Sequence, residues 1–567
     1  MEERIWHRFY EPGVPPSIDY EPLTLPQFLD RAAAAHPDAT ALFFLNRRLS
    51  YRELKEQVDR LATALARLGV ERGVRVAIQM PNLPQVVIAY YATLSLGAQV
   101  VMTSPLYVPR EIEHQWHDAG CTVAIVADYL YEGRVRPIRD RLPVKEYVIA
   151  SIPEYARFPL SVLLPFRLRR GASPRIARIA PEPGVHPFRR LIRATPPRPP
   201  RVSSALDDVA VLQYTGGTTG LPKAAMLTHR NLSCNVQQLR AWFPDMRPGR
   251  EVMLAVLPYF HSFGMTVGMN FPVCVAAAAV VIPDPRDAAW IAKSLQRHRV
   301  TLLPAVPALF TSILSHARDR HLDLTSVKRC FSGSAPLSPE LLQRFEAATG
   351  GTIAEGFGLT EASPVTHANP LFGQRKVGTI GLPVPDTDAK IVDPADGTTE
   401  LPPGEEGELI LRGPQVMGGY ANRPEETAAT LRGGWLYTGD LAVMDEEGYF
   451  RIVGRKKELI VAAGYKIFPD EVDRVLLAHP AVLEAATIGV PDPRRGEAVK
   501  SFVVLRPSAR ATAEELVAYC RENLASYKVP RRIEFRDELP KSGALKILRR
   551  ELREQELARM RERGRSV

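Results

Sequence analysis

The N-terminal part of the chain alternates between short apolar runs and longer segments with helical periodicity. Runs rich in Val, Ile and Ala, typical of buried strands, lie at 74–80, 99–104 and 122–128, and helical patterns lie at 86–97 and 110–118. Strands that alternate with helices form right-handed βαβ units, which build a parallel sheet covered by helices. An α/β fold is therefore predicted for this part of the chain.

One helix in this part is marked at both ends. Ser50 and Glu53 have the spacing of a capping box, in which each side chain accepts a hydrogen bond from the backbone N–H of the other residue. Apolar residues then recur at helical spacing up to Leu68, and Gly69 is expected to end the helix. The sequence predicts a helix between Ser50 and Gly69.

The chain has 567 residues, whereas a single domain usually has roughly 150, so at least two domains are expected. Ordered α/β patterning runs to about Gly448, and short helices and strands then alternate up to a basic helix from Lys546 onward. We expect a large N-terminal domain of parallel-rich α/β sheets over 1–454 and a small, mobile C-terminal α+β domain over 455–567, with a linker near 455–458.

The charge of the chain is concentrated in the segment 157–201. Lys and Arg number 73 and Asp and Glu 63, and 73 − 63 = +10. The segment holds eleven Arg and one acidic residue, Glu182, so it accounts for the whole excess, and it also holds ten prolines and the apolar stretch LSVLLPF. It is expected either to contact an anionic membrane surface or to form a solvated, flexible loop. Nucleic-acid binding is disfavoured because the segment interleaves few aromatic residues and contains no recognisable binding module.

The cysteines and the N-terminus predict a cytoplasmic protein. The five cysteines are scattered, so neither a disulfide framework nor a structural zinc site is expected, and the first residues lack the apolar segment of a signal peptide. Residues 263–282 carry no charge, which would suit a membrane-spanning helix. They include two glycines, an asparagine and a proline, so a buried helix that runs into a strand is favoured.

The sharpest local signal is the stretch YTGGTTGLPK at 214–223, which follows an apolar run and precedes a predicted helix. Small residues let backbone N–H groups converge on phosphate oxygens, threonine hydroxyls add donors, and Lys223 adds positive charge. The stretch is not a Walker A loop because Pro222 precedes the lysine. A phosphate-binding loop is predicted, and a Gly/Thr-rich surface turn is the alternative.

The stretch 214–229, YTGGTTGLPKAAMLTH, resembles the phosphate loop of adenylate-forming enzymes, which include acyl-CoA synthetases, luciferases and peptide-synthetase adenylation domains. Further motifs match in the family's order: LPYFHSFGM (257–265), SGSAPL (332–337), EGFGLTE (355–361), WLYTGDL (435–441), GRKKELIVAAGYKIFPDEVD (454–473) and LPKSGALKILRREL (539–552). Together they span about residues 25 to 553, and the variants look most like bacterial long-chain fatty acid–CoA ligases.

The resemblance implies an adenylate-forming fold and a two-step reaction with ATP, Mg²⁺ and coenzyme A. A fatty acid carboxylate attacks the α-phosphate of ATP to give an acyl-adenylate and pyrophosphate, and the CoA thiol then displaces AMP. Both steps build up negative charge, so the site needs preorganised cations and N–H donors more than a nucleophilic side chain.

The resemblance also implies the nucleotide site. Residues assigned to the β- and γ-phosphates are Thr215, Gly216, Gly217, Thr218, Thr219, Gly220 and Lys223. Residues assigned to the adenine are Gly333, Ser334, Ala335, Pro336, Glu355, Gly356, Phe357, Gly358 and Leu359, with Phe357 as the stacking ring. The remaining nucleotide contacts are assigned to Asp440 and Arg455 at the ribose and to Ile452.

Catalytic roles follow from the same resemblance. Thr360 is assigned to the α-phosphate and Lys546 to a bridge between carboxylate and α-phosphate. Glu361, with Thr215, is assigned to Mg²⁺, a hard cation that suits one carboxylate plus phosphate oxygens. His261 is placed between acyl pocket and adenylate.

A domain rotation is implied between the two steps. Lys457 matches the hinge, about which the small domain turns to withdraw Lys546 and to bring Gly464, Tyr465 and Lys466 to the pantetheine of CoA.

Structural alternatives exist for these residues. Glu361 and Asp440 could be capping or turn acids, and His261 could be a core histidine. Two positions depart from the family pattern, which has glycine where this chain has Leu545 and Ala224. Neither change removes a charge, so the rate of adenylation is put in doubt more than its existence.

The acyl pocket is expected around 261–269 and 306–314, which are largely apolar and carry no charged residue. An amino acid substrate would need a buried acid for its ammonium group, so a hydrophobic acid is favoured. The resemblance implies a long chain, and medium-chain and aryl acids stay open. The alternative functions are an acyl-AMP ligase that loads a carrier protein and a non-catalytic nucleotide- and lipid-binding homologue. The oligomeric state is left open by the sequence, with a homodimer as one alternative.

Overall fold

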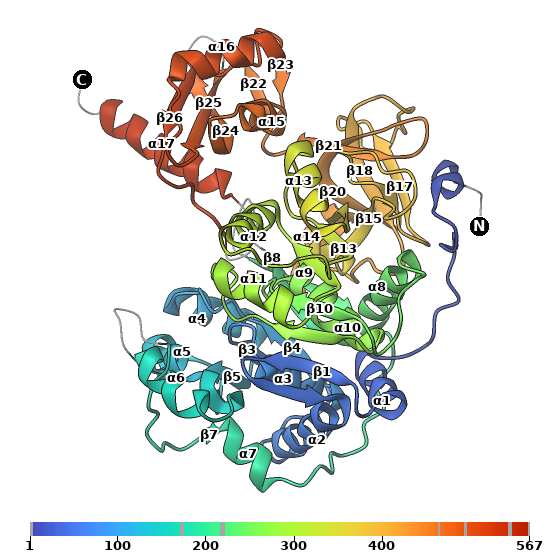
Figure 1. The fold of residues 1–567 in the computed structure, drawn as a ribbon, viewed down its shortest axis with the longest axis vertical. Coiled ribbons are helices and arrows are strands. Elements are labelled where there is room, and N and C mark those ends of the chain that lie inside the picture. Colours follow the sequence, from blue (N-terminus) through green and yellow to red (C-terminus); the bar gives the residue numbers. More distant parts are fainter. Residues whose placement is uncertain are drawn as a thin grey trace.

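The computed structural model describes residues 4–169, 175–215, 222–462, 465–492, 496–542 and 547–564. Its strands form four sheets, which Figure 1 shows as two stacked α/β layers, a smaller β-rich part and a separate C-terminal part. This is the adenylate-forming arrangement that the sequence predicts, with parallel-rich sheets in the N-terminal part and a small, mostly antiparallel sheet at the C-terminus.

The first sheet has seven strands, and all neighbouring pairs except the last are parallel. Its order is β7 (Val185–Pro187), β6 (Glu146–Ala150), β5 (Val123–Ala127), β3 (Arg75–Gln79), β4 (Gln99–Met102), β8 (Val209–Thr215), β9 (Lys223–Thr228). The predicted strands are confirmed as β3, β4 and β5, and the predicted helices as α3 (Pro84–Ser95) and α4 (Pro109–Ala119).

The predicted capping box is confirmed at the start of α2 (Tyr51–Arg67). Ser50 Oγ accepts a hydrogen bond from the Glu53 N–H at 3.2 Å, and a Glu53 carboxylate oxygen accepts one from the Ser50 N–H at 2.8 Å. The helix buries its apolar face, including Leu54, Val58 and Leu61, and packs against α3.

The second sheet has nine strands, with parallel pairing in the centre and antiparallel pairing at both edges. Its order is β16 (Leu382–Pro383), β15 (Val365–Ala368), β14 (Thr352–Gly358), β13 (Arg329–Ser332), β12 (Leu302–Ala305), β10 (Val252–Ala255), β11 (Ala278–Val281), β1 (Thr40–Phe44), β2 (Arg47–Ser50). Residues 263–282 form buried helical turns followed by β11, as the sequence predicts. Among the residues described, no helix is both long and apolar enough to cross a bilayer.

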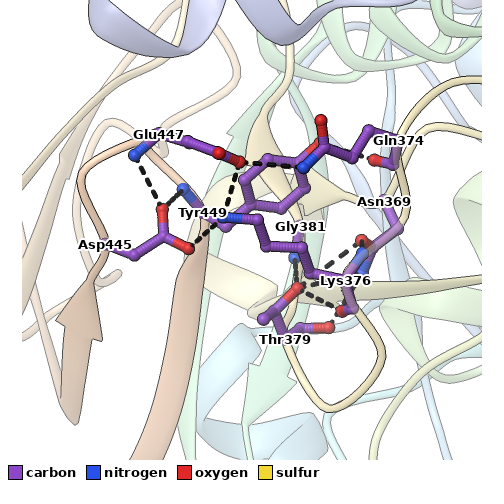
Figure 2. A network of polar contacts seen from close by, with 8 residues as sticks. All are labelled: Asn369, Gln374, Lys376, Thr379, Gly381, Asp445, Glu447 and Tyr449. Carbon is purple, nitrogen blue, oxygen red and sulfur yellow. Dashed lines mark hydrogen bonds and ion pairs between the residues drawn. The ribbon is translucent and has the colours of Figure 1, made fainter.

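A third sheet contains β17 (Asp388–Val392), β18 (Gly407–Arg412), β19 (Leu431–Arg432), β20 (Trp435–Met444) and β21 (Phe450–Arg455). A polar network ties the turn after β20 to the loop after β15 (Figure 2). In it the Lys376 ammonium lies 2.5 Å from Asp445 Oδ2, 2.7 Å from Glu447 Oε2 and 4.5 Å from the centre of the Tyr449 ring.

The fourth sheet, at the C-terminus, contains β22 (Ile460–Ala462), β23 (Tyr465–Ile467), β24 (Val482–Asp492), β25 (Gly496–Leu505) and β26 (Arg532–Phe535). Its helices are α15 (Pro469–Ala478), α16 (Ala513–Asn523) and α17 (Arg549–Gly564). The last helix thus begins at Arg549 rather than near Lys546, because Ile547 still pairs with Lys541 in an isolated bridge.

The segment 157–201 is less irregular than its composition suggests. It contains α6 (Leu160–Arg169), the edge strand β7 and α7 (Phe188–Ala194), which packs against α2 and buries Phe188 completely. The expectation of one insertion that interrupts the α/β pattern is therefore wrong for its second half. A three-residue strand beside proline carries no alternation signal, and an edge position tolerates proline.

Candidate active site

The predicted phosphate loop connects two antiparallel strands. β8 ends at Thr215, β9 begins at Lys223, and these two residues pair across the ladder. Gly216, Gly217, Thr218, Thr219 and Gly220 lie outside the described residues. The expectation of a helix directly after the loop is wrong, because residues 223–228 pair with the edge of β8 and α8 (His229–Trp242) begins only after them.

Thr360 and Glu361 lie in a short 3-10 helix, η6 (Thr360–Ala362), which follows β14. Thr360 Oγ1 lies 3.2 Å from Ser262 Oγ at the start of α9 (Ser262–Met265). The Glu361 carboxylate accepts a hydrogen bond of 2.6 Å from the Tyr420 hydroxyl, and the Lys223 ammonium lies 5.3 Å from the centre of the same ring. The lysine of the phosphate loop and the predicted metal ligand therefore meet at one aromatic side chain.

The residues assigned to adenine lie at the ends of the adjacent parallel strands β13 and β14. Gly333 follows β13, and a Cβ there would lie 3.1 Å from the Phe263 ring. Ser334, Ala335 and Pro336 are exposed, whereas Gly356, Phe357 and Leu359 are half-buried and Gly358 is exposed. The Phe357 ring meets His367 edge-on, with 6.2 Å between centroids.

Glu355 has a structural role of its own. One of its carboxylate oxygens accepts from the Leu337 N–H at 3.1 Å and the other from the Gly378 N–H at 3.2 Å. Burial raises the pKa of this carboxyl, although both backbone hydrogen bonds oppose the shift. The side chain therefore joins the loop after β13 to the loop after β15.

Asp440 on β20 and Arg455 on β21 are direct cross-strand partners. The Arg455 Nε lies 2.9 Å from Asp440 Oδ1, and the aspartate side chain is only 3% exposed. The Asp440 charge raises the pKa of Arg455 and outweighs burial. Ile452 is half-buried on the same strand pair, opposite Ala442.

His261 caps the start of α9, where its carbonyl accepts from the Met265 N–H at 2.9 Å. It is half-buried, next to the fully buried stretch 264–275. The second stretch assigned to the acyl pocket begins α12 (Pro307–Asp319) and buries Leu309, Phe310 and Ile313. Both stretches are apolar and belong to the core of the N-terminal part.

The predicted hinge residue Lys457 lies in the exposed turn between β21 and β22. On one side of it, the Lys456 ammonium contacts Glu408 Oε2 of β18 at 2.9 Å. On the other side, Glu458 Oε2 contacts Arg549 of the C-terminal helix at 2.7 Å. The two neighbours of Lys457 are thus held by different parts of the molecule.

The residues assigned to CoA and to adenylation are only partly described. Tyr465 on β23 is 55% exposed, and its ring stacks on Tyr527 with 4.5 Å between centroids. Lys466 pairs with Val461 in the same sheet. Gly464, Leu545 and Lys546 lie outside the described residues.

Mg²⁺ is implied by the resemblance, and the donors present suit it. Glu361 and Thr215 offer a carboxylate and a hydroxyl oxygen, and Mg²⁺ is commonly bound by one or two carboxylates plus substrate phosphates. Within the described ranges, no three His, Cys, Asp or Glu side chains gather as a metal site. The carboxylate and the hydroxyl fit a Mg²⁺ ion whose other ligands are phosphate oxygens.

Tyr420 and Ser262 are missing from the sequence-based site. Ser262 lies inside the motif LPYFHSFGM, directly after the predicted residue His261. Tyr420 ends the stretch GPQVMGGY at 413–420, which follows directly after β18. Its glycines and its aromatic residue are the local signal that could have pointed to a functional loop.

The parallel-rich α/β sheets of the N-terminal part and the small C-terminal sheet define the class of AMP-forming nucleotide enzymes. The AMP-binding enzyme model matches residues 29–421, and the AMP-binding enzyme C-terminal domain matches 471–546. The chain therefore belongs to the AMP-binding enzyme family.

Full-length relatives agree with this assignment. The chain is 42% identical to a long-chain-fatty-acid–CoA ligase of Bacillus subtilis, over 98% of this chain and 99% of the relative. It is 38% identical to a protein of the same name from Escherichia coli, over 98% of both. A crystal structure of an anthranilate CoA ligase in complex with anthranoyl-AMP superposes with a TM-score of 0.84 at 28% identity, over 95% of this chain and 98% of that chain.

Proposed function

We propose that this protein is an ATP-dependent, AMP-forming fatty acid–CoA ligase that acts on long-chain fatty acids. The observation that carries the proposal is that Lys223 of β9 and Glu361 of η6, which also holds Thr360, both contact the Tyr420 side chain. Together with the charge of its ion-pair partner Asp440, the Glu361 charge also raises the pKa of Arg455. The full-length relatives named long-chain-fatty-acid–CoA ligase support the substrate class.

In the first step the fatty acid carboxylate attacks the α-phosphate of ATP, and pyrophosphate leaves. Lys223 and the loop it follows hold the leaving phosphates, Thr360 donates to the α-phosphate, and Asp440 accepts from the ribose hydroxyls. Lys546 bridges the carboxylate and the α-phosphate. Glu361 and Thr215 would hold Mg²⁺ together with ATP, and the bound ion would neutralise phosphate charge. The rate gain comes from oriented reactants and fixed positive charge.

In the second step the CoA thiol attacks the acyl carbon, and AMP leaves. We propose that 1–454 and 455–567 act as two domains that turn about Lys457. The ties of Lys456 to Glu408 and of Glu458 to Arg549 support this position, because the backbone is anchored immediately before and after it. The rotation brings Gly464, Tyr465 and Lys466 to the pantetheine.

The acyl group lies along the uncharged stretches 261–269 and 306–314. Neither stretch offers an acid for a substrate ammonium, and burial of an unpaired charge costs roughly several kcal/mol, so a hydrophobic acid is favoured over an amino acid. His261 lies between this region and the adenylate.

The test is a panel of carboxylates with short, medium, long and aryl chains, assayed for pyrophosphate release with and without CoA. We expect the highest kcat/KM for long chains and acyl-CoA formation only with CoA. Lys546→Ala should lose most of the adenylation. Wild-type pyrophosphate release no faster than that of Lys546→Ala would contradict the enzyme assignment, and product on a carrier protein instead of CoA would favour the acyl-AMP ligase.

We also propose that α6 makes the peripheral membrane contact of segment 157–201. The helix buries none of its residues, and Val162, Leu163 and Phe166 are 52%, 59% and 60% exposed. Its other face places Leu164 and Leu168 against the core. Exposed arginines flank the outer face, a combination that suits an anionic lipid surface in which fatty acids partition.

Co-sedimentation with anionic and neutral vesicles tests this contact. Leu163→Ser with Phe166→Ser should reduce binding to anionic vesicles, whereas Phe372→Ser, which removes an aromatic side chain 63% exposed elsewhere, should not. Equal binding by all three proteins would reject a membrane role of α6.

A further inference from the structure

Tyr420 joins the two charged groups to which the proposed reaction assigns phosphate and metal. Its hydroxyl donates to Glu361 Oε1 at 2.6 Å, and its ring faces the Lys223 ammonium at 5.3 Å. The Tyr420 side chain is 8% exposed, so neither contact is made through a freely moving group. Hydrogen bonds to a carboxylate are roughly twice as strong as neutral ones, and a lysine above an aromatic ring is attracted by its electron-rich face.

The backbone holds Tyr420 in this place. Residues 419–421 pair with 224–226, the strand that begins at Lys223, through hydrogen bonds of 2.9 Å at each end. Three residues before the tyrosine, the Met417 N–H donates to the Glu361 carbonyl at 2.8 Å. The segment is therefore attached both to the strand after the phosphate loop and to the helix with the metal ligand.

We propose that Tyr420 is a positioning residue for the metal–nucleotide complex. Its hydroxyl holds one oxygen of Glu361 and leaves the second for Mg²⁺, and its ring restricts the Lys223 ammonium. A third contact supports this arrangement, because Glu426 Oε1 lies 3.9 Å from the same ammonium. The inference rests on the proposed function for the identity of the ligand, Mg²⁺–ATP.

Metal binding without turnover tests the role. Mn²⁺ is added to mixtures of protein and ATP in place of Mg²⁺, and its binding is measured by electron paramagnetic resonance. Tyr420→Phe removes only the hydroxyl and is expected to weaken Mn²⁺ binding in the ATP complex about tenfold. Metal-free ATP binding, measured by calorimetry in chelator, is expected to change less than about threefold, because the ring still faces Lys223. Tyr420→Leu removes ring and hydroxyl and is expected to weaken both.

Tyr449→Phe is the matched control. Tyr449 also has a lysine ammonium over its ring, and its hydroxyl also donates a hydrogen bond, here to the Gln374 carbonyl (Figure 2). It is expected to bind Mn²⁺–ATP as wild type does, and thermal unfolding shows whether each variant is folded. Unchanged Mn²⁺ affinity in folded Tyr420→Phe, or an equal loss in Tyr449→Phe, would overturn the proposal. A wild type that binds Mn²⁺–ATP but forms no acyl-adenylate would reject the ligase function and leave the role of Tyr420 standing.

Discussion

Arg549 at the first position of α17 and Glu458 in the turn after β21 form an ion pair, with 2.7 Å between Nη1 and Oε2. The same guanidinium contacts Asp470 and, at 2.6 Å, the buried Asp473 of α15. The C-terminal helix and the residue after the predicted hinge therefore belong to one connected unit.

Glu458→Gln should uncouple this unit from the hinge. The change removes one charge and leaves Arg549 paired with Asp470 and Asp473, so the free energy of unfolding should fall by about 1 kcal/mol. Formation of acyl-CoA should slow more than adenylation, because only the second step requires the rotation. Pyrophosphate exchange and acyl-CoA production, measured on the same sample, separate the two steps.

Arg550→Ala is the control for this variant. Arg550 is exposed and pairs with Glu554 one turn along α17, so its loss should change stability by no more than about 0.5 kcal/mol and affect neither step. If Glu458→Gln slowed both steps equally, the coupling to the hinge would be refuted.

Asp440→Asn should weaken ATP binding and destabilise the third sheet. Asp440 is almost fully buried, and the change leaves Arg455 without its close anionic partner, although the arginine is 36% exposed and water screens part of the loss. We expect a loss of about 2 kcal/mol in unfolding free energy and a rise of about tenfold in the KM for ATP. Urea unfolding and ATP titration measure the two effects. An unchanged KM would refute the ribose assignment, and Asp445→Asn, in the surface network, serves as control.

A buried ion triad stabilises the C-terminal part. The Lys500 ammonium lies 2.7 Å from both Glu534 and Glu556, and the side chains of Lys500 and Glu556 are each 7% exposed. Lys500→Met should cost about 2–3 kcal/mol, since it removes the buried cation between two carboxylates, although Arg559 still lies near both and Arg536 still pairs with Glu534. The double variant Lys500→Met with Glu556→Leu should recover part of this loss. Denaturant unfolding that finds the double variant less stable than the single one would disagree with this account.

The same triad predicts a loss of stability in acid. Burial opposes ionisation of Glu534, but hydrogen bonds from Lys500 and Arg559 outweigh it and lower the pKa from 4.5 to about 2. A lower pKa in the folded state means that the unfolded state binds more protons, so this stabilisation is complete above about pH 4.5 and is lost as the pH falls toward 2. Melting temperatures across this range should fall less steeply for Glu534→Gln than for wild type, and parallel curves would contradict the prediction.

Local patterns predicted much of the fold. The Ser50–Glu53 capping box, the strands β3, β4 and β5 and the buried stretch 263–282 follow from periodicity and hydrogen-bonding side chains within one segment. The strand β9, the edge strand β7 and the start of α17 were mispredicted. β7 and β9 are the edge strands of one sheet, and their pairing leaves no local period. The start of α17 is set by the bridge between Lys541 and Ile547, which helical periodicity does not reveal.

The sequence by itself determined the family, because the motifs that contain Lys223, Glu361 and Asp440 match it in residue types and order. Only the tertiary structure decided which of these groups share a contact. Tyr420 lies 59 residues after Glu361 in sequence, yet it hydrogen-bonds that carboxylate and faces Lys223. Such a contact depends on how three strand and helix ends converge across two sheets, and no spacing along the chain encodes that convergence.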